Sequence, residues 1–109
     1  MFDFFKKSID NNSSKSFVEE PNTVVVTTKF VIKENKTITY VSHDLEDNTW
    51  QFWSNDSYDD YREIVMLVSL KNVIEKDKSL LEISDLPLGF VATRKDKNDK
   101  WKISKQNNN

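Results

Sequence analysis

The sequence contains no cysteine, a single glycine and only two prolines. Without cysteine the chain can form neither disulfides nor thiolate metal sites. Its longest apolar runs, such as the stretch from Ile64 to Val68, are far shorter than the roughly 18 residues that indicate a membrane span. At the N-terminus the lysines follow the apolar residues, which is the reverse of the order in a secretory signal, so we expect a cytoplasmic protein.

Charged residues are abundant but unevenly distributed. They make up 31% of the chain, and the net charge of −2 is too small to predict nucleic-acid binding, which usually needs an excess of lysine and arginine. Residues 94–105 are mostly basic, whereas residues 44–63 contain one arginine and the following carboxylates: Asp44, Glu46, Asp47, Asp56, Asp59, Asp60 and Glu63. This acidic segment favours a basic partner.

A chain of 109 residues suits one domain. We expect residues 1–20 to form an N-terminal segment and polar linker, residues 21–105 a single domain, and residues 106–109 a disordered tail. In the N-terminal segment, Phe2, Phe5 and Ile9 fit one face of a short helix.

Residues 47–61 contain two of the three tryptophans and two of the three tyrosines. Trp50 and Phe52 alternate with Gln51 and Trp53, a period of two that is typical of a half-buried β-strand. We therefore expect Trp50 and Phe52 to lie in the core. Trp53 then lies on the other face, where a helix over residues 70–76, the N-terminal segment or a binding partner would cover it.

β-Branched and aromatic residues predict strands over residues 24–32 and 37–41, joined as a hairpin by a polar turn. With the tryptophan strand following them, three consecutive antiparallel strands are the simplest topology. A second hairpin is expected from residues 90–94 and 101–103. It follows Gly89, which we expect to have a positive φ.

Ser69 precedes apolar residues at helical spacing, which predicts a helix over residues 70–76 that ends at Asp77. Residues 79–83 predict a second helical turn. The expected fold class is α+β: a single domain with a mainly antiparallel sheet of about five or six strands and one or two short helices on one face.

Catalytic and metal sites are weakly indicated. His43 stands beside Asp44, the minimum for general-base chemistry, but Ser42 and Ser54 lack the glycine-rich surroundings of a nucleophile elbow. The acidic segment lacks the glycine and the ligand spacing of a calcium loop. We therefore expect a loop histidine, no catalytic residues, no metal and no cofactor.

A partner-binding surface is better indicated. Asp56 or Ser57 could cap a helical turn that places two tyrosines on one face. Aromatic side chains among carboxylates combine groups that anchor an interface with a negative field that speeds encounter. The predicted partner-binding residues are Trp53, Asp56, Tyr58, Asp59, Asp60 and Tyr61.

Several short motifs occur in a characteristic order between Val24 and Trp101. They are Val-Thr-x-Lys at residues 26–29, Asp-x-x-Trp-x-Phe at 47–52, Asp-Asp-Tyr at 59–61, Ser-Leu-x-x-Val-Ile at 69–74, Asp-Lys-Ser-Leu at 77–80 and Pro-x-Gly-x-x-x-x-Arg at 87–94. In this order the chain resembles a family of small bacterial proteins once filed as a domain of unknown function, now immunity-protein family thirty-three of polymorphic toxin systems. Thr49 and Asn55 stand where members typically carry glycine.

The resemblance implies a cytoplasmic immunity protein that binds and neutralises a cognate toxin by occlusion. The charge pattern suggests a basic, nucleic-acid-attacking toxin domain as the partner, with no direct contact to nucleic acid or membrane. Two alternatives stay open: a small hydrolase-type enzyme that uses His43 and the acidic segment, and a regulatory or structural module outside any toxin system.

Overall fold

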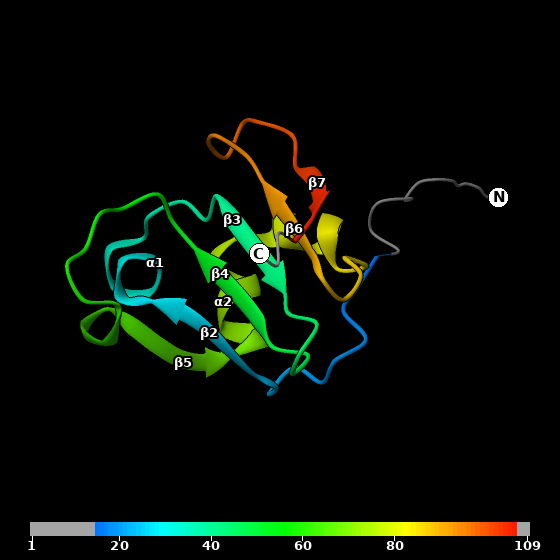
Figure 1. Ribbon diagram of the computed structural model, residues 1–109, viewed down its shortest axis with the longest axis horizontal. Coiled ribbons are helices and arrows are strands. Elements are labelled where there is room, and N and C mark those ends of the chain that lie inside the picture. The colour runs from blue at the N-terminus through cyan, green and yellow to red at the C-terminus, as the bar shows by residue number, and fades with distance from the viewer. Residues whose placement is uncertain (1–14, 107–109) are drawn as a thin grey trace, which may run out of the picture.

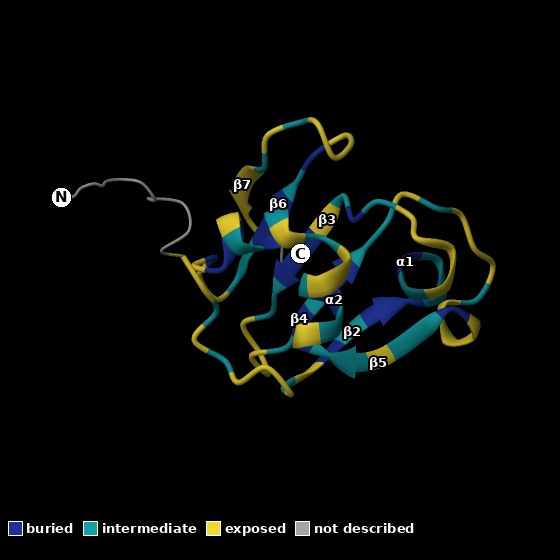
Figure 2. Cartoon of the chain, turned by 180° about the vertical axis from the view of Figure 1, so that it is seen from behind, coloured by how far each residue is buried: buried dark blue, intermediate teal, exposed yellow. Residues whose placement is uncertain are grey.

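The computed structural model describes residues 15–106. Six strands form one sheet in the order β5-β2-β4-β3-β6-β7, which confirms the predicted α+β fold. Helix α2 lies behind this sheet in Figure 1 and in front of it in Figure 2. The elements in chain order are β2 (Val24–Thr28), α1 (Lys29–Glu34), β3 (Tyr40–His43), β4 (Trp50–Trp53), the 3-10 helix η3 (Tyr61–Glu63), β5 (Val65–Ser69), α2 (Leu70–Lys76), the 3-10 helix η4 (Lys78–Ile83), β6 (Phe90–Thr93) and β7 (Lys102–Lys105).

The order of the strands differs from the expected succession of three antiparallel neighbours. Strand β4 lies between β2 and β3, and it pairs with β2 in parallel, with Val26 opposite Gln51. The remaining neighbouring strands are antiparallel, so the sheet is mixed. The predicted hairpin between residues 24–32 and 37–41 is therefore wrong, because β4 separates β2 from β3 in the sheet.

Helix α1 takes the place of the second half of the long strand predicted over residues 24–32. The Thr28 side chain accepts a hydrogen bond from the Val31 amide at the start of α1, and Asn35, with φ 57°, ends it. Helix α1 places Val31 in the core, where it is 1% exposed. This burial outweighs the β propensity of the segment, and strand β3 begins only at Tyr40.

Trp50 and Phe52 lie in the core, as alternation along their strand predicts. They are 1% and 0% exposed, and the same core contains Leu70 and Val73 of α2. Helix α2 has its predicted bounds. It begins where the Ser69 side chain accepts a hydrogen bond from the amide of the third residue in the helix, and it ends at Asp77. The tryptophan strand is thus held between its neighbours in the sheet and α2.

Gly89 introduces the predicted closing hairpin of β6 and β7. Its φ of +83° confirms the expected left-handed conformation, which glycine adopts without a steric penalty. Its amide donates to the His43 carbonyl at 2.7 Å, and its carbonyl accepts from the Gln106 amide at 2.7 Å. Gly89 therefore joins the ends of β3 and β7.

Residues 15–20 pack on the domain, so the ordered fold begins before the expected boundary at residue 21. The Phe17 ring meets Trp50 edge-on at 4.9 Å, and the Trp50 indole N–H donates to Glu19 at 3.0 Å. At the other end, Gln106 is hydrogen-bonded to the domain instead of belonging to a free tail. The helical face predicted at Phe2, Phe5 and Ile9 and the tail residues 107–109 lie outside the described residues.

Candidate binding surface

The face of the sheet opposite α2 presents a row of side chains from neighbouring strands; we call it the open face, and it looks toward the viewer in Figure 1. Its members follow from the strand register, because residues opposite each other share a face. The half-buried or exposed members include Val24, Val26, Tyr40, Gln51, Trp53 and Leu67, whereas Ser42 on the same face is buried. Tyr40 is 37% and Leu67 is 67% exposed. The open face therefore offers aromatic and aliphatic surface to a partner.

Trp53 lies on the open face, as alternation predicts, and two tyrosines accompany it. Tyr40 is its cross-strand neighbour in β3, and the Tyr58 ring centroid lies 6.0 Å from that of Trp53 at an interplanar angle of 31°. Helix α2 does not cover Trp53, because it packs on the opposite face. Trp53 is thus half-buried beside Tyr58, which is itself 47% exposed.

A chain of hydrogen bonds fixes the polar part of the open face. The Trp53 indole N–H donates to Gln51 Oε1 at 2.9 Å, and Gln51 Nε2 donates to Asp44 Oδ2 at 2.6 Å. Gln106 Nε2 donates to the other oxygen of Asp44 at 3.1 Å. Because each amide is used in a defined orientation, the Trp53 ring is held in place before any partner arrives, which reduces the entropy lost on binding.

The burial of Tyr40 and, secondly, the negative charge of Asp44 raise the pKa of the Tyr40 phenol above its ordinary value. Both causes disfavour the phenolate. Tyr40 is therefore a neutral hydrogen-bond donor on this face at physiological pH.

The acidic segment after β4 is organised differently from the predicted helical turn. Asp60, not Asp56 or Ser57, is the N-cap, and the turn it begins is the 3-10 helix η3. Tyr61 lies in η3 and is 58% exposed, whereas Tyr58 lies before it. The two tyrosines therefore do not share a helical turn, and Tyr58 is the one that joins Trp53.

The three aspartates of this segment have different surroundings. Asp59 is exposed, and Asp56 accepts a hydrogen bond from Ser54 at 2.7 Å. Asp60 accepts two side-chain hydrogen bonds from Arg62, at 3.1 and 2.9 Å, and these bonds hold the pKa of Asp60 below its usual range. Arg62 therefore compensates the charge of Asp60, whereas within residues 15–106 no cationic side chain pairs with Asp56 or Asp59.

The expectation that His43 lies in a loop is wrong. His43 is the last residue of β3, and its side chain is on the core side of the sheet. Its ring stacks on Trp50 with centroids 4.0 Å apart, and its Nδ1 lies 2.8 Å from the Leu86 carbonyl oxygen. Since a carbonyl oxygen only accepts, Nδ1 carries the proton. Ser42 points to the opposite face, as neighbours in a strand do, so the two side chains form no nucleophile and base pair.

Glu19 completes the surroundings of His43, and nothing in the sequence pattern indicated it. Its Oε2 accepts from the Trp50 indole and lies 3.8 Å from His43 Nε2. The His43 side chain is 12% exposed. These contacts tie residues 15–20 to the sheet and favour a structural role for His43.

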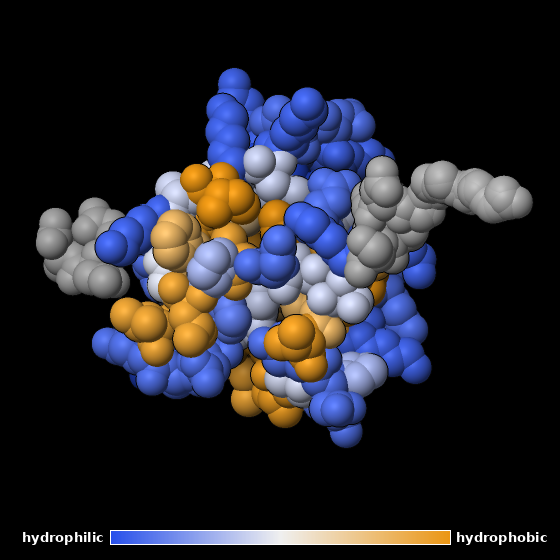
Figure 3. Space-filling model, turned by 90° about the vertical axis from the view of Figure 1, so that its right-hand side faces the viewer, coloured by the Kyte–Doolittle hydropathy of each residue, from blue (hydrophilic) through white to orange (hydrophobic). Residues whose placement is uncertain are grey.

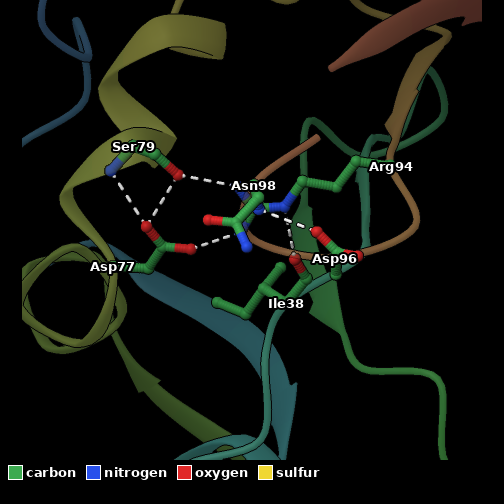
Figure 4. Close-up of polar contacts among 6 residues, drawn as sticks. All are labelled: Ile38, Asp77, Ser79, Arg94, Asp96 and Asn98. Carbon is green, nitrogen blue, oxygen red and sulfur yellow. Dashed lines mark hydrogen bonds and ion pairs between the residues drawn. The ribbon is translucent and has the colours of Figure 1, made fainter. Parts of the chain in front are cut away.

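Arg94 contacts Asp77 and Ser79 of the Asp-Lys-Ser-Leu motif, and these contacts lie inside the fold (Figure 4). Its guanidinium donates to the Asp77 carboxylate, to Ser79 Oγ at 2.9 Å and to the Ile38 carbonyl at 2.9 Å. It also lies over the Trp101 ring at 4.0 Å. Arg94 therefore pairs with Asp77 rather than with the acidic segment, and with a side chain only 1% exposed it is a structural residue.

Apolar side chains also reach the surface at the end of the molecule shown in Figure 3. They form separate areas between hydrophilic side chains there. The exposed aromatic residues of the described chain, Tyr40, Tyr58 and Tyr61, belong instead to the open face or to the acidic segment beside it. We therefore regard Trp53, its two tyrosine neighbours and the adjacent carboxylates as the candidate site.

Within residues 15–106, the structure brings together no group of three or more histidine or carboxylate side chains that could hold a metal ion. The helices in this part of the chain are too short and too polar to cross a membrane.

No family model, no curated protein and no solved structure matches this chain.

Proposed function

We propose that this protein is an immunity protein that binds a cognate bacterial toxin in the cytoplasm and neutralises it by occlusion. The observation that carries the proposal is the open face, where the half-buried Trp53 lies beside Tyr58, a residue that Asp56 and the exposed Asp59 flank in the chain. Aromatic side chains of this kind are frequent energetic centres of protein interfaces. The sequence resemblance supports the choice of a toxin as the partner.

The charge of the site suggests the chemistry of that partner. A negative surface accelerates encounter with a positive one, and aromatic groups stabilise the complex once water has left the contact. A toxin domain that attacks nucleic acid needs a basic cleft for its substrate. Carboxylates at residues 56 and 59 would approach this cleft, and Trp53 with Tyr58 would fill part of it, so that the substrate is excluded. The protein needs no cofactor for this role.

The contacts of His43 make the hydrolase alternative less well supported. Its Nδ1 is used by the Leu86 carbonyl, its ring is stacked on Trp50, and its Nε2 faces Glu19. A general base needs an accessible nitrogen within hydrogen-bond reach of a substrate, whereas Nε2 faces a carboxylate 3.8 Å away on a side chain that is 12% exposed. We therefore expect purified His43→Ala to lose stability, with no hydrolytic activity to lose.

A pull-down from the native cell, with the full chain as bait, tests the proposal. We expect a basic toxin domain to be captured at a one-to-one ratio by the wild-type protein and to be lost when Trp53 and Tyr58 are both changed to Ala. As a charge test, Asp56→Lys with Asp59→Lys should slow association with that toxin about ten-fold at low salt, and less at high salt. Asp60 is left unchanged because it caps η3.

A matched control reverses two charges in the turn between β6 and β7, which together form the basic hairpin, with Lys95→Glu and Lys97→Glu. Both residues are exposed and lie far along the chain from the acidic segment. We expect these changes to leave toxin binding unaltered. If they abolish binding while the changes at residues 53, 56, 58 and 59 have no effect, the basic hairpin is the interface and the proposed site is wrong.

A further inference from the structure

Strand β5 forms one edge of the sheet, and β2 is its single strand neighbour within residues 15–106 (Figure 1). Its sequence, Val-Met-Leu-Val-Ser, contains no charge, proline or glycine. The opposite edge, β7, has a lysine at each end, Lys102 and Lys105. Proteins commonly use lysine to prevent edge strands from pairing with other chains. β7 has this protection and β5 does not.

The unpaired backbone groups of β5 can be identified from the hydrogen bonds at the two ends of its ladder with β2. The Lys29 amide donates to the Ile64 carbonyl, and the Leu70 amide donates to the Thr23 carbonyl, both at 2.8 Å. In an antiparallel ladder, bonded and non-bonded pairs alternate. The even-numbered residues of this segment therefore bond to β2. The N–H and C=O groups of Val65, Leu67 and Ser69 point away from the sheet.

We propose that β5 pairs with β5 of a second copy of this chain, antiparallel, about a two-fold axis at Leu67. Because the outward groups are spaced evenly about Leu67, the arrangement is self-complementary, as a two-fold dimer requires. Leu67 lies opposite the partner's Leu67, and Val65 lies opposite the partner's Ser69. Each such pair exchanges two backbone hydrogen bonds. The two sheets become one continuous sheet.

Side-chain charges flanking β5 fit this arrangement. Glu63 precedes Leu67 by the same number of residues as Lys71 follows it. Glu63 is the last residue of η3 and Lys71 is the second residue of α2, so both lie just outside the strand. The two-fold axis places Glu63 of one copy at the same end of the strand pair as the partner's Lys71, and the reverse holds at the other end. Both residues are exposed. Opposite charges at the same end of the strand pair attract each other, whereas like charges there would repel the second copy.

The exposure of Leu67 gives the pairing an apolar centre. Leu67 is 67% exposed on the open face, where its partner's Leu67 would cover part of it. An interface of one strand pair is small, so we expect dissociation constants in about the micromolar range. The dimer uses the backbone edge of β5, whereas the candidate site is centred on Trp53 of β4, which β2 separates from β5 in the sheet.

Sedimentation velocity on the full chain, from about 1 μM to 1 mM, tests the proposal. We expect a monomer–dimer equilibrium for the wild type and an association at least about ten-fold weaker for Leu67→Lys, which places two ammonium groups at the axis. Ile103→Lys is the matched control, because Ile103 is exposed at the centre of the other edge strand, and it should dimerise as the wild type does. Circular dichroism should show the same fold for both variants.

Charge exchange provides a second and more specific test. Glu63→Lys alone and Lys71→Glu alone should each weaken the dimer about three-fold or more at low salt, and the variant with both changes should recover wild-type association. A wild type that stays monomeric at the highest concentration overturns the proposal. So does a dimer that Leu67→Lys leaves intact, or one that the double charge exchange fails to restore.

Discussion

The buried ion pair between Arg94 and Asp77 allows a sharp test of how this fold is held together. Removing one partner of a buried pair costs about 3–5 kcal/mol, because the other charge is left without compensation. The two side chains differ in exposure, at 1% for Arg94 and 22% for Asp77. Water can therefore solvate the Asp77 carboxylate when Arg94 is replaced, but it cannot solvate the Arg94 guanidinium when Asp77 is replaced.

The expected losses of unfolding free energy follow from this difference. Arg94→Met keeps much of the packing against Trp101 and should cost about 3 kcal/mol, the lower end of the range. Asp77→Ala strands the guanidinium and also removes the acceptor for the amide and hydroxyl of Ser79 at the start of η4, so it should cost about 5 kcal/mol. Arg94→Lys should be destabilising too, because an ammonium cannot reproduce the planar fork of donors.

Urea denaturation followed by tryptophan fluorescence measures these differences, with unchanged slopes as the check on two-state behaviour. Lys95→Met is the matched control, since it removes the neighbouring, exposed cation and should alter stability by less than about 0.5 kcal/mol. A loss below about 1 kcal/mol for Arg94→Met, or a smaller loss for Asp77→Ala than for Arg94→Met, would refute the reasoning.

Three further outcomes are expected. Trp50→Ala should lower the unfolding free energy by about 3–5 kcal/mol in the same denaturation assay, because the indole is 1% exposed and supports both His43 and Phe17. The raised pKa of Tyr40 should give stability that is fully present below the ordinary value of 10.0 and is lost as pH rises through the folded value; Tyr40→Phe should remove this alkaline loss in denaturation series. Trp53→Ala should raise the dissociation rate of the captured toxin in surface-binding kinetics with little effect on association, whereas an unchanged dissociation rate would remove Trp53 from the interface.

Local sequence patterns predicted several features of the structure correctly. The alternation around Trp50 and Phe52 is a short-range property, and it assigned both rings to the core and Trp53 to the other face. The cap at Ser69 fixed the start of α2, and the single glycine marked a position with positive φ. These features depend on backbone geometry within a few residues, so they can be predicted from the sequence alone.

Other features of the candidate site depended on which elements meet. The turn begins at Asp60, whose carboxylate Arg62 holds, although Asp56 and Ser57 were equally good caps in the sequence. Tyr58 lies before this turn, beside Trp53. Arg94 could have paired with any of several acidic residues, and only the fold places it beside Asp77. Contacts of this kind join residues far apart in the chain, so no local pattern records them.

The strand order was decided entirely by tertiary structure. Residues 30–32 have strong β propensity, yet they are helical because Val31 gains a place in the core there. The sequence by itself determined the two faces of the tryptophan strand and the start of α2. Only the tertiary structure decided that β2 lies beside β4 and that β5 is an open edge. The neighbours of a strand depend on how much side-chain surface the paired strands bury together, and the residues of one strand alone do not determine this.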